Sequence, residues 1–422
     1  MTAPGCIGLS EASADQPAAA GSLRRGALYA LALGTFAVGT EGFMIAALLP
    51  TISHSLSVSV QAAGQLVTIF ALVYALSSPI LTALTSATPR RTLLMASLGT
   101  FAVANLAAAY APGYWSLMVA RMLLALAAGL YVPNANALAG ALAAPRHRGR
   151  ALGIVNGGIT VAIALGVPLG AFIGAHLGWR ATFIGVAVLS AIALTSLAAL
   201  LPRDIEAPAP SSLRDRVAVI AAPSAFPTLL VTMLWAVAAY TVYTYIAPYL
   251  SAAAALTPGQ IGAVLMVYGV SALIGVTLGG AGVDRFGSRS MQAIALPVML
   301  SAFALLPFAG FLSSASSIFA IIPLIVIWGV SAWSFFPAQQ SRLIGVVGLA
   351  NTPLILSLNA SFMYLGFSVG AALGSLVISL FGVIWIGAAG AISLAAAMAT
   401  SRFAFRQRNV RTPAGDLSNL VI

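Results

Sequence analysis

The chain has 422 residues, of which 60% are hydrophobic and only 6% are charged. Soluble domains carry about a quarter charged residues, so this composition excludes a soluble globular protein and indicates an integral membrane protein. The formal net charge of +11 comes from arginines scattered between apolar runs, which is typical of charge that orients a membrane protein and not of nucleic-acid binding.

The first 23 residues are rich in Ala, Ser, Gly and Pro, which predicts a disordered cytoplasmic tail without a cleavable signal peptide. Beyond this tail, apolar runs of about 20 residues alternate with short polar turns, and each run can cross a bilayer as a helix. We predict twelve spans, at residues 26–49, 60–83, 92–111, 115–142, 151–177, 181–201, 226–249, 258–283, 291–311, 317–338, 353–380 and 383–401.

The arginines predict the orientation of these spans. They fall before the first span, after the last span and in the turns that follow even-numbered spans, except for Arg121 inside a span and Arg180 in another turn. Because cytoplasmic loops carry the excess of basic residues, both termini are expected in the cytoplasm. The longest loop divides the spans six and six, so the expected domains are a tail at 1–23, bundles at 24–201 and 224–402, a linker at 202–223 and a tail at 403–422.

Glu41 lies inside the first apolar run and is the only charged residue in it. A carboxylate at membrane depth costs ~2.5–3.5 kcal/mol on insertion scales, so such a group usually marks an ion or proton path. The other seven acidic residues lie in predicted tails or loops. The alternative is a carboxyl group that stays protonated or hydrogen-bonded for helix packing.

Arg121 is the one basic residue inside a predicted span, about six residues from its start. One interpretation is that it holds water or lowers the proton affinity of a nearby carboxylate. The other is that its long side chain extends to the membrane surface. The sequence leaves both open.

The fifth span contains Gly166, Pro168 and Gly170. Small residues four positions apart let helices approach closely, and a proline inside a helix frees a backbone carbonyl and can kink it. We predict that these three residues form a hinge or seal between helices. Gly366, Gly370 and Gly374 of the eleventh span repeat the spacing of Gly166, Gly170 and Gly174, which indicates that the two halves are repeats.

The turn after the eighth span runs from Gly280 to Arg289 and contains Asp284, Arg285 and Gly287. An acidic residue at a helix end can bind the N-terminus of a neighbouring helix or an arginine, so Asp284, Arg285, Gly287 and Arg289 are predicted to latch one conformation. The alternative is a solvated turn that only sets topology.

This turn resembles the loop signature of the major facilitator superfamily, Gly-x-x-x-Asp-Arg-Phe-Gly-x-Arg. The matching turn in the first half keeps Arg90 and Arg91, which we include in the latch, but has Ser86 where the acid is expected. The span containing Pro168 resembles the Gly-x-Pro-x-x-Gly signature of the proton-coupled exporters in that superfamily. The surroundings of Glu41 resemble the branch of drug:proton antiporters that includes sugar or arabinose efflux and chloramphenicol-resistance permeases, in which an acid at this place is implicated in proton coupling.

The resemblance implies an all-α membrane protein with twelve helices in two pseudo-symmetric bundles of six, multi-pass in the bacterial inner membrane. It implies a monomer that exports a sugar, drug or nucleoside-like metabolite in exchange for protons, with Glu41 and Arg121 in proton coupling. Its expected partners are the lipid bilayer, a small-molecule substrate and protons. A symporter or uniporter for uptake, or a membrane sensor that does not transport, remains an alternative.

Polar and aromatic residues in the spans are candidates for a substrate cavity between the bundles. They are Tyr74, Asn134, Asn136, Asn156, Tyr240, Tyr243, Trp333, Asn359 and Tyr364. An enzyme is not expected, because one cysteine, three scattered histidines and one buried acid assemble no evident metal cluster or catalytic triad. No phosphate-binding Gly-Lys-Ser/Thr loop is present, so we expect no cofactor and a proton gradient as the energy source.

Overall fold

The computed structural model describes residues 16–85, 87–143, 147–201, 225–348 and 351–410, and these residues form helices without any strand. The first half contains α1 (Gln16–Ser55), α2 (Val60–Leu84), α3 (Arg90–Ala109), α4 (Tyr114–Leu142), α5 (Arg148–Val161), the π-helix η2 (Ala162–Gly166), α6 (Val167–Leu177) and α7 (Trp179–Leu200). The second half contains α9 (Ala225–Tyr243), α10 (Ile246–Ala254), α11 (Pro258–Gly310), α12 (Ser314–Val347), α13 (Thr352–Phe381), the 3₁₀-helix η4 (Val383–Trp385) and α14 (Ile386–Val410).

The described helices supply twelve membrane crossings, as the apolar runs predict. Eleven helical segments are long and apolar enough to cross a membrane. One of them, α11, has 53 residues, or about 80 Å at the rise of an α-helix, more than twice the ~30 Å of a bilayer core. At Gly287 its backbone turns to φ 80°, ψ 160°, which separates the two crossings.

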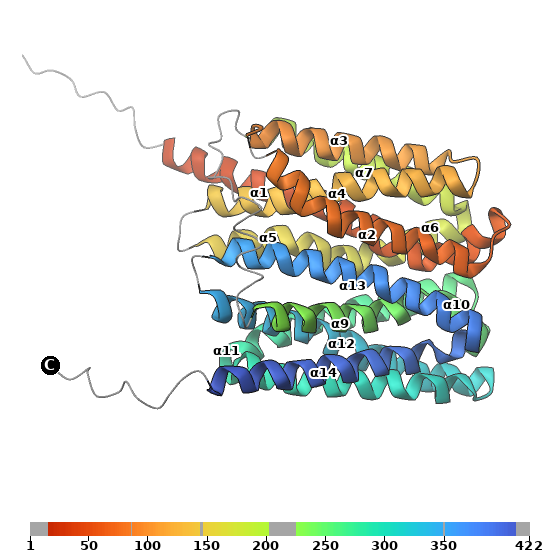
Figure 1. The fold of residues 1–422 in the computed structure, drawn as a ribbon. Coiled ribbons are helices and arrows are strands. Elements are labelled where there is room, and N and C mark those ends of the chain that lie inside the picture. The colour runs from red at the N-terminus through yellow and green to blue at the C-terminus, as the bar shows by residue number, and fades with distance from the viewer. Residues whose placement is uncertain (1–15, 86, 144–146, 202–224, 349–350, 411–422) are drawn as a thin grey trace, which may run out of the picture.

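The helices form two bundles that lie side by side (Figure 1). Helices α1 to α7 make the first bundle and α9 to α14 the second, and the bundles meet where α2 packs on α13 and where η2 and α6 pack on α11. The start of α1 and the end of α14 lie at the same end of the molecule (Figure 1). Because α3, α5 and the second half of α11 also begin at this end, with Arg90, Arg148 and Arg289 in or near their first turns, we call it the arginine-rich end.

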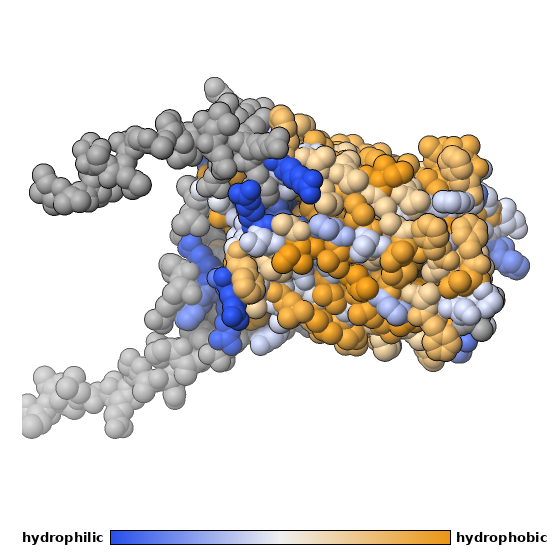
Figure 2. All heavy atoms as spheres, turned by 90° about the horizontal axis from the view of Figure 1, so that it is seen from below, coloured by the Kyte–Doolittle hydropathy of each residue, from blue (hydrophilic) through white to orange (hydrophobic). Residues whose placement is uncertain are grey.

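The flank of the molecule is apolar, whereas hydrophilic residues gather at its ends (Figure 2). Aromatic side chains at the end opposite the arginines are strongly exposed, among them Tyr110, Trp115, Phe311 and Phe381. Soluble proteins do not expose so much contiguous apolar surface, and aromatic rings are enriched where a protein crosses the membrane interface. The surface is therefore that of a chain embedded in lipid.

Two predicted spans are less regular than expected. The span at 226–249 is broken at Thr244 and Tyr245, because Pro248 has no N–H for the carbonyl of Thr244 and is best placed in the first turn of a new helix, α10. The span at 151–177 contains the π-helix η2 before Pro168. This proline likewise removes one helical hydrogen bond, and a π-turn accommodates the local change.

The repeated glycines have the same role in both halves. In the first bundle, Gly166 and Gly170 lie against Thr40 and Met44 of α1. In the second bundle, Gly366, Gly370 and Gly374 lie against Met233, Val237 and Thr241 of α9. Each set lets the fifth span of its bundle approach the first span closely, because a side chain at these positions would meet the neighbouring helix.

Gly269 of α11 lets the backbones of the two bundles approach closely, since a methyl group there would collide with the backbone of Ile163 and Ala164 in η2. We expect Gly269→Ala to destabilise this arrangement by roughly 1–3 kcal/mol, as other overpacking substitutions do. The population with separated bundles should rise about 5- to 150-fold. Spin labels at Trp115→Cys and Phe311→Cys, with Cys6 replaced by serine, would report the distance distribution.

The matched control is Gly259→Ala on the same helix, where a methyl group meets nothing within 4 Å. It should leave the distance distribution unchanged. Identical distributions for Gly269→Ala and the control would contradict the assignment of this contact as a constraint between the bundles.

Candidate functional site

Glu41 of α1 and Arg121 of α4 form an ion pair inside the first bundle, and both side chains are completely buried. Arg121 donates through Nη1 to Glu41 Oε1 and through Nε to the carbonyl of Leu66 in α2, at 3.2 Å. Its guanidinium also lies over the ring of Phe70, 4.3 Å from the centroid. The interpretation of Arg121 as a residue that extends to the surface is therefore wrong, because Glu41 and the Phe70 ring hold its side chain inside the bundle.

The pair leaves polar atoms without partners. Glu41 Oε2, Arg121 Nη2 and Thr40 Oγ1 are buried and have no hydrogen-bond partner among the described residues. Buried polar atoms are nearly always hydrogen-bonded, so unpaired ones at a charged pair make this place a candidate functional site. Removing one charge would leave the other uncompensated in a medium where that is costly.

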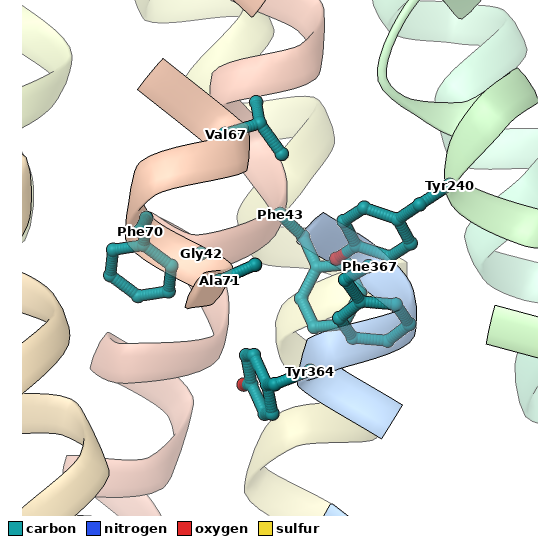
Figure 3. A pocket seen from close by; sticks show the side chains of 8 residues that line it. All are labelled: Gly42, Phe43, Val67, Phe70, Ala71, Tyr240, Tyr364 and Phe367. Carbon is teal, nitrogen blue, oxygen red and sulfur yellow. The ribbon is translucent and has the colours of Figure 1, made fainter. Parts of the chain in front are cut away.

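A narrow cleft lies between the bundles, next to this pair (Figure 3). Its first wall comes from α1 and α2 and its second wall from α9 and α13. Phe70 belongs to both the cleft and the pair, because its ring lines the cleft and lies under the Arg121 guanidinium. The lining residues are Gly42, Phe43, Val67, Phe70, Ala71, Tyr240, Tyr364 and Phe367.

Aromatic rings connect the two walls. Phe43 of the first bundle contacts Tyr240, Tyr243 and Phe367 of the second, with ring centroids 5.9–6.5 Å apart, and Tyr243 Oη donates to the Phe43 carbonyl at 3.2 Å. Further along the interface Tyr74 stacks on Tyr364, with centroids 3.7 Å apart and an interplanar angle of 16°. The cleft is thus enclosed by rings from both bundles.

The structure brings four of the predicted cavity residues to this interface: Tyr74, Tyr240, Tyr243 and Tyr364. It places three predicted asparagines elsewhere in the first bundle. Asn134 accepts a hydrogen bond from Arg90 and donates to the Leu130 carbonyl. Asn136 donates to Asn156 at 3.3 Å, which joins α4 to α5.

Asn359 lies in a buried polar network of the second bundle and not in the cleft. It accepts from Thr232, whose hydroxyl accepts from Gln339, and Gln339 in turn accepts from Gln292. Arg342 donates to Gln292 at 2.8 Å. The network joins α9, α11, α12 and α13. Trp333 of α12 is not part of this network, and its indole donates to the Tyr268 hydroxyl of α11 at 3.2 Å.

The predicted latch residues do not meet in this arrangement. Asp284 is exposed and forms no ion pair with another described residue, and the Arg285 guanidinium lies over the Phe286 ring at 5.3 Å. Arg91 donates to the Ala198 carbonyl at 2.7 Å, which ties α3 to α7. Gly287 supplies the turn between the crossings of α11, Arg289 is exposed beyond it, and Ser86 lies outside the described residues. A latch at this turn stays a prediction.

The hinge prediction stays open as well, although its residues lie close to the site. Gly166 ends the π-helix and contacts Thr40, the neighbour of Glu41. Pro168 is buried in the first turn of α6. A change in the π-turn would therefore move the backbone beside the ion pair.

Sequence reasoning missed three rings of the cleft, Phe43, Phe70 and Phe367. Each lies in an apolar run, where a phenylalanine is an ordinary core or lipid-facing residue, so no local signal separates it from its neighbours. Among the described residues, no group of three or more His, Cys, Asp or Glu side chains could hold a metal ion.

Comparison with known proteins shows which family the sequence matches. The sequence pattern described as "Major Facilitator Superfamily" matches residues 31–343. The "Uncharacterized MFS-type transporter YbcL" of Bacillus subtilis (strain 168) is 33% identical over 366 residues, which cover 86% of this chain and 92% of that protein. The "Chloramphenicol resistance protein" of Streptomyces lividans is 30% identical over 353 residues, 83% of this chain and 87% of that protein.

The fold is similar to that of a bacterial homologue of the human lysosomal transporter Spinster, solved in an inward-facing and unoccupied conformation. The TM-score is 0.73 at 18% sequence identity, with 93% of this chain and 99% of that chain covered. At this identity the likeness concerns the fold.

Proposed function

The chain belongs to the Major Facilitator Superfamily and is a membrane transporter, not an enzyme, and we propose that it exports a small organic molecule in exchange for protons. The substrate binds in the cleft between the bundles, and Glu41 carries the proton. Transport proceeds by rocking of the bundles, which exposes the cleft to one side of the membrane at a time. The working protein is a monomer in the bacterial inner membrane, with the arginine-rich end in the cytoplasm.

The observation that carries this proposal is the fully buried Glu41–Arg121 pair beside the cleft. When Glu41 is ionised the pair has no net charge, and when Glu41 is protonated the Arg121 charge stands alone. Protonation therefore adds one uncompensated positive charge in a low-dielectric region, where charges interact strongly. Such a change is large enough to bias an equilibrium between two arrangements of the bundles.

The second bundle is placed to respond to this change. Tyr240 and Tyr364 of the second bundle line the wall of the cleft opposite Phe70. A substrate between those walls would contact Phe70, on whose ring Arg121 rests. Substrate and proton thus act on the same group of side chains, which is what exchange without a proton leak requires.

Two features support export over uptake. The glycine and proline pattern around Pro168 resembles that of proton-coupled exporters, and a relative is named a chloramphenicol resistance protein. The orientation rests on the arginines, because Arg148, Arg285, Arg289 and Arg402 are exposed at one end of the molecule, and the cytoplasmic side of membrane proteins is the basic one.

The test is transport by the purified protein in liposomes with an imposed pH gradient and the membrane potential clamped at zero. Labelled chloramphenicol and a labelled pentose serve as first substrates, followed by a panel of metabolites identified from the sensitivity of deletion and overexpression strains. An antiporter accumulates substrate on the acidic side. Accumulation on the alkaline side would contradict antiport and indicate a symporter, and flux that ignores the gradient would indicate a uniporter. Binding without flux would indicate a sensor.

A further inference from the structure

We infer that the substrate presents an uncharged aromatic ring to the cleft between the bundles, and that ring contacts, not sugar-type hydrogen bonds, select it. This inference rests on the proposed function, since it names the chemical class that the same site takes. The argument depends on what lines the cleft, on how its nearest charges are engaged and on where the amide side chains lie.

The lining is aromatic on both sides. Five of its eight residues carry rings, and the remaining three, Gly42, Val67 and Ala71, are small or aliphatic. The only polar side-chain atoms among the eight are the hydroxyls of two tyrosines. Aromatic rings stack in offset or edge-to-face arrangements with other rings, and each such pair contributes beyond its buried area. The ring-bearing residues are Phe43, Phe70, Tyr240, Tyr364 and Phe367.

The nearest charges compensate each other while Glu41 is ionised. Arg121 is bound to Glu41, to the Leu66 carbonyl and to the face of Phe70, and no charged residue belongs to the cleft lining. An ionised substrate would have to lose its hydration without a free counter-charge in the wall, which is costly. An uncharged molecule avoids this cost.

The amide side chains that would recognise a sugar lie elsewhere. Asn134 is bound by Arg90 and Asn136 by Asn156 within the first bundle, and Asn359 belongs to the buried network of the second. Recognition of several sugar hydroxyls needs matched donors and acceptors, because each unpaired polar group that is buried costs free energy. Two tyrosine hydroxyls do not provide such a set.

Stacked pairs at the cleft offer positions that a ring can take. Tyr240 and Phe367 stack within the second bundle, with centroids 3.6 Å apart, and Tyr74 and Tyr364 stack across the interface at 3.7 Å. A planar substrate ring placed against Tyr364 would substitute for Tyr74 and release a contact that joins the bundles. Binding would then favour separation of the bundles on that side.

The experiment compares matched probes that differ only in the ring. Calorimetric titration of the purified protein in nanodiscs, without any gradient, measures binding of the p-nitrophenyl, cyclohexyl and methyl galactosides. A second series consists of the p-nitrophenyl, cyclohexyl and methyl amides of glycerate. We expect both p-nitrophenyl probes to bind at least tenfold more tightly than their cyclohexyl partners, and the methyl galactoside not to bind. Equal binding of the methyl and aryl galactosides, or no binding of either aryl probe, would overturn the inference.

A substitution tests whether the aryl ring of the probe binds in this cleft. Phe367→Leu keeps an apolar side chain but removes one ring, so aryl binding should weaken roughly 3- to 10-fold, as expected for one aromatic pair, while cyclohexyl binding stays the same. The control is Phe226→Leu, which removes a ring that pairs with Phe362 outside the cleft. Equal losses in the two variants would place the aryl probe elsewhere.

Failure of this inference can be told from failure of the proposed function. If a pentose accumulates on the acidic side of the liposomes while no aryl probe binds, proton-coupled export stands and the aromatic class is wrong. If aryl probes bind but no compound responds to the pH gradient, the substrate class stands and proton coupling is wrong.

Discussion

Glu41→Gln is expected to abolish accumulation of substrate against its gradient while leaving downhill exchange intact. In liposomes with a pH difference of one unit, the intact protein should concentrate a neutral substrate about tenfold per proton exchanged, since about 1.4 kcal/mol corresponds to a factor of ten. Glutamine keeps the size and hydrogen-bonding reach of the side chain but cannot lose a proton. The expected accumulation ratio for the variant is therefore about one.

The physical reason lies in the isolation of this carboxyl group. Glu41 is buried completely, and its only charged contact within the described parts of the chain is Arg121. The variant leaves the Arg121 charge uncompensated at all pH values, so the charge of the site no longer changes with pH. It should bind and exchange substrate without responding to protons.

The measurement is counterflow of labelled substrate in the presence and absence of the pH gradient. Glu206→Gln is the matched control, because it makes the same chemical change in the predicted linker, outside the described residues. It should accumulate substrate like the unchanged protein. Full accumulation by Glu41→Gln would show that protons, if they are coupled, use another group.

The second large effect concerns the free energy of unfolding. We expect Glu41→Met or Arg121→Met alone to lower it by roughly 3–5 kcal/mol, because each leaves one buried charge without its partner. The double substitution removes both charges and replaces them with apolar side chains, and such replacements of buried pairs are often neutral or stabilising. The double variant should therefore be more stable than either single variant.

Chemical unfolding of the purified protein in micelles would measure these differences, with tryptophan fluorescence as the signal. Arg150→Met serves as the control, because Arg150 is exposed and the loss of an exposed charge changes stability little. If the effects of the two single substitutions simply add in the double variant, the pair is not coupled energetically. The double variant should fold yet fail to accumulate substrate, which separates the stabilising role of the pair from its role in transport.

The two halves share a fold but differ in their buried polar groups, as the network around Gln339 and the pair at Glu41 show. The glycines of the fifth and eleventh spans pack alike, yet the second bundle contains a largely uncharged network of amides and hydroxyls. Among the described membrane spans, Glu41 is the only acid buried in a bundle. Proton coupling in this chain is therefore asymmetric if it uses a carboxyl group.

The amino-acid sequence by itself determined the membrane class, the twelve crossings and the isolation of Glu41. These features are readable because insertion into a bilayer depends on the composition of each local run, and because a charge within such a run is conspicuous. The turn at Gly287 and the kinked segment before Pro168 were also predictable, since glycine and proline act on their own backbone.

Only the tertiary structure decided which side chains meet. Arg121 lies 80 residues from Glu41, and its span alone left open whether it reaches the surface or pairs with an acid. The cleft was equally out of reach, because Phe43, Phe70 and Phe367 look like any other ring in an apolar run. The rotation of each helix about its axis selects the rings that face the other bundle and the asparagines that face their own. That rotation is set by packing against neighbouring helices, so it cannot be predicted from the sequence of one span alone.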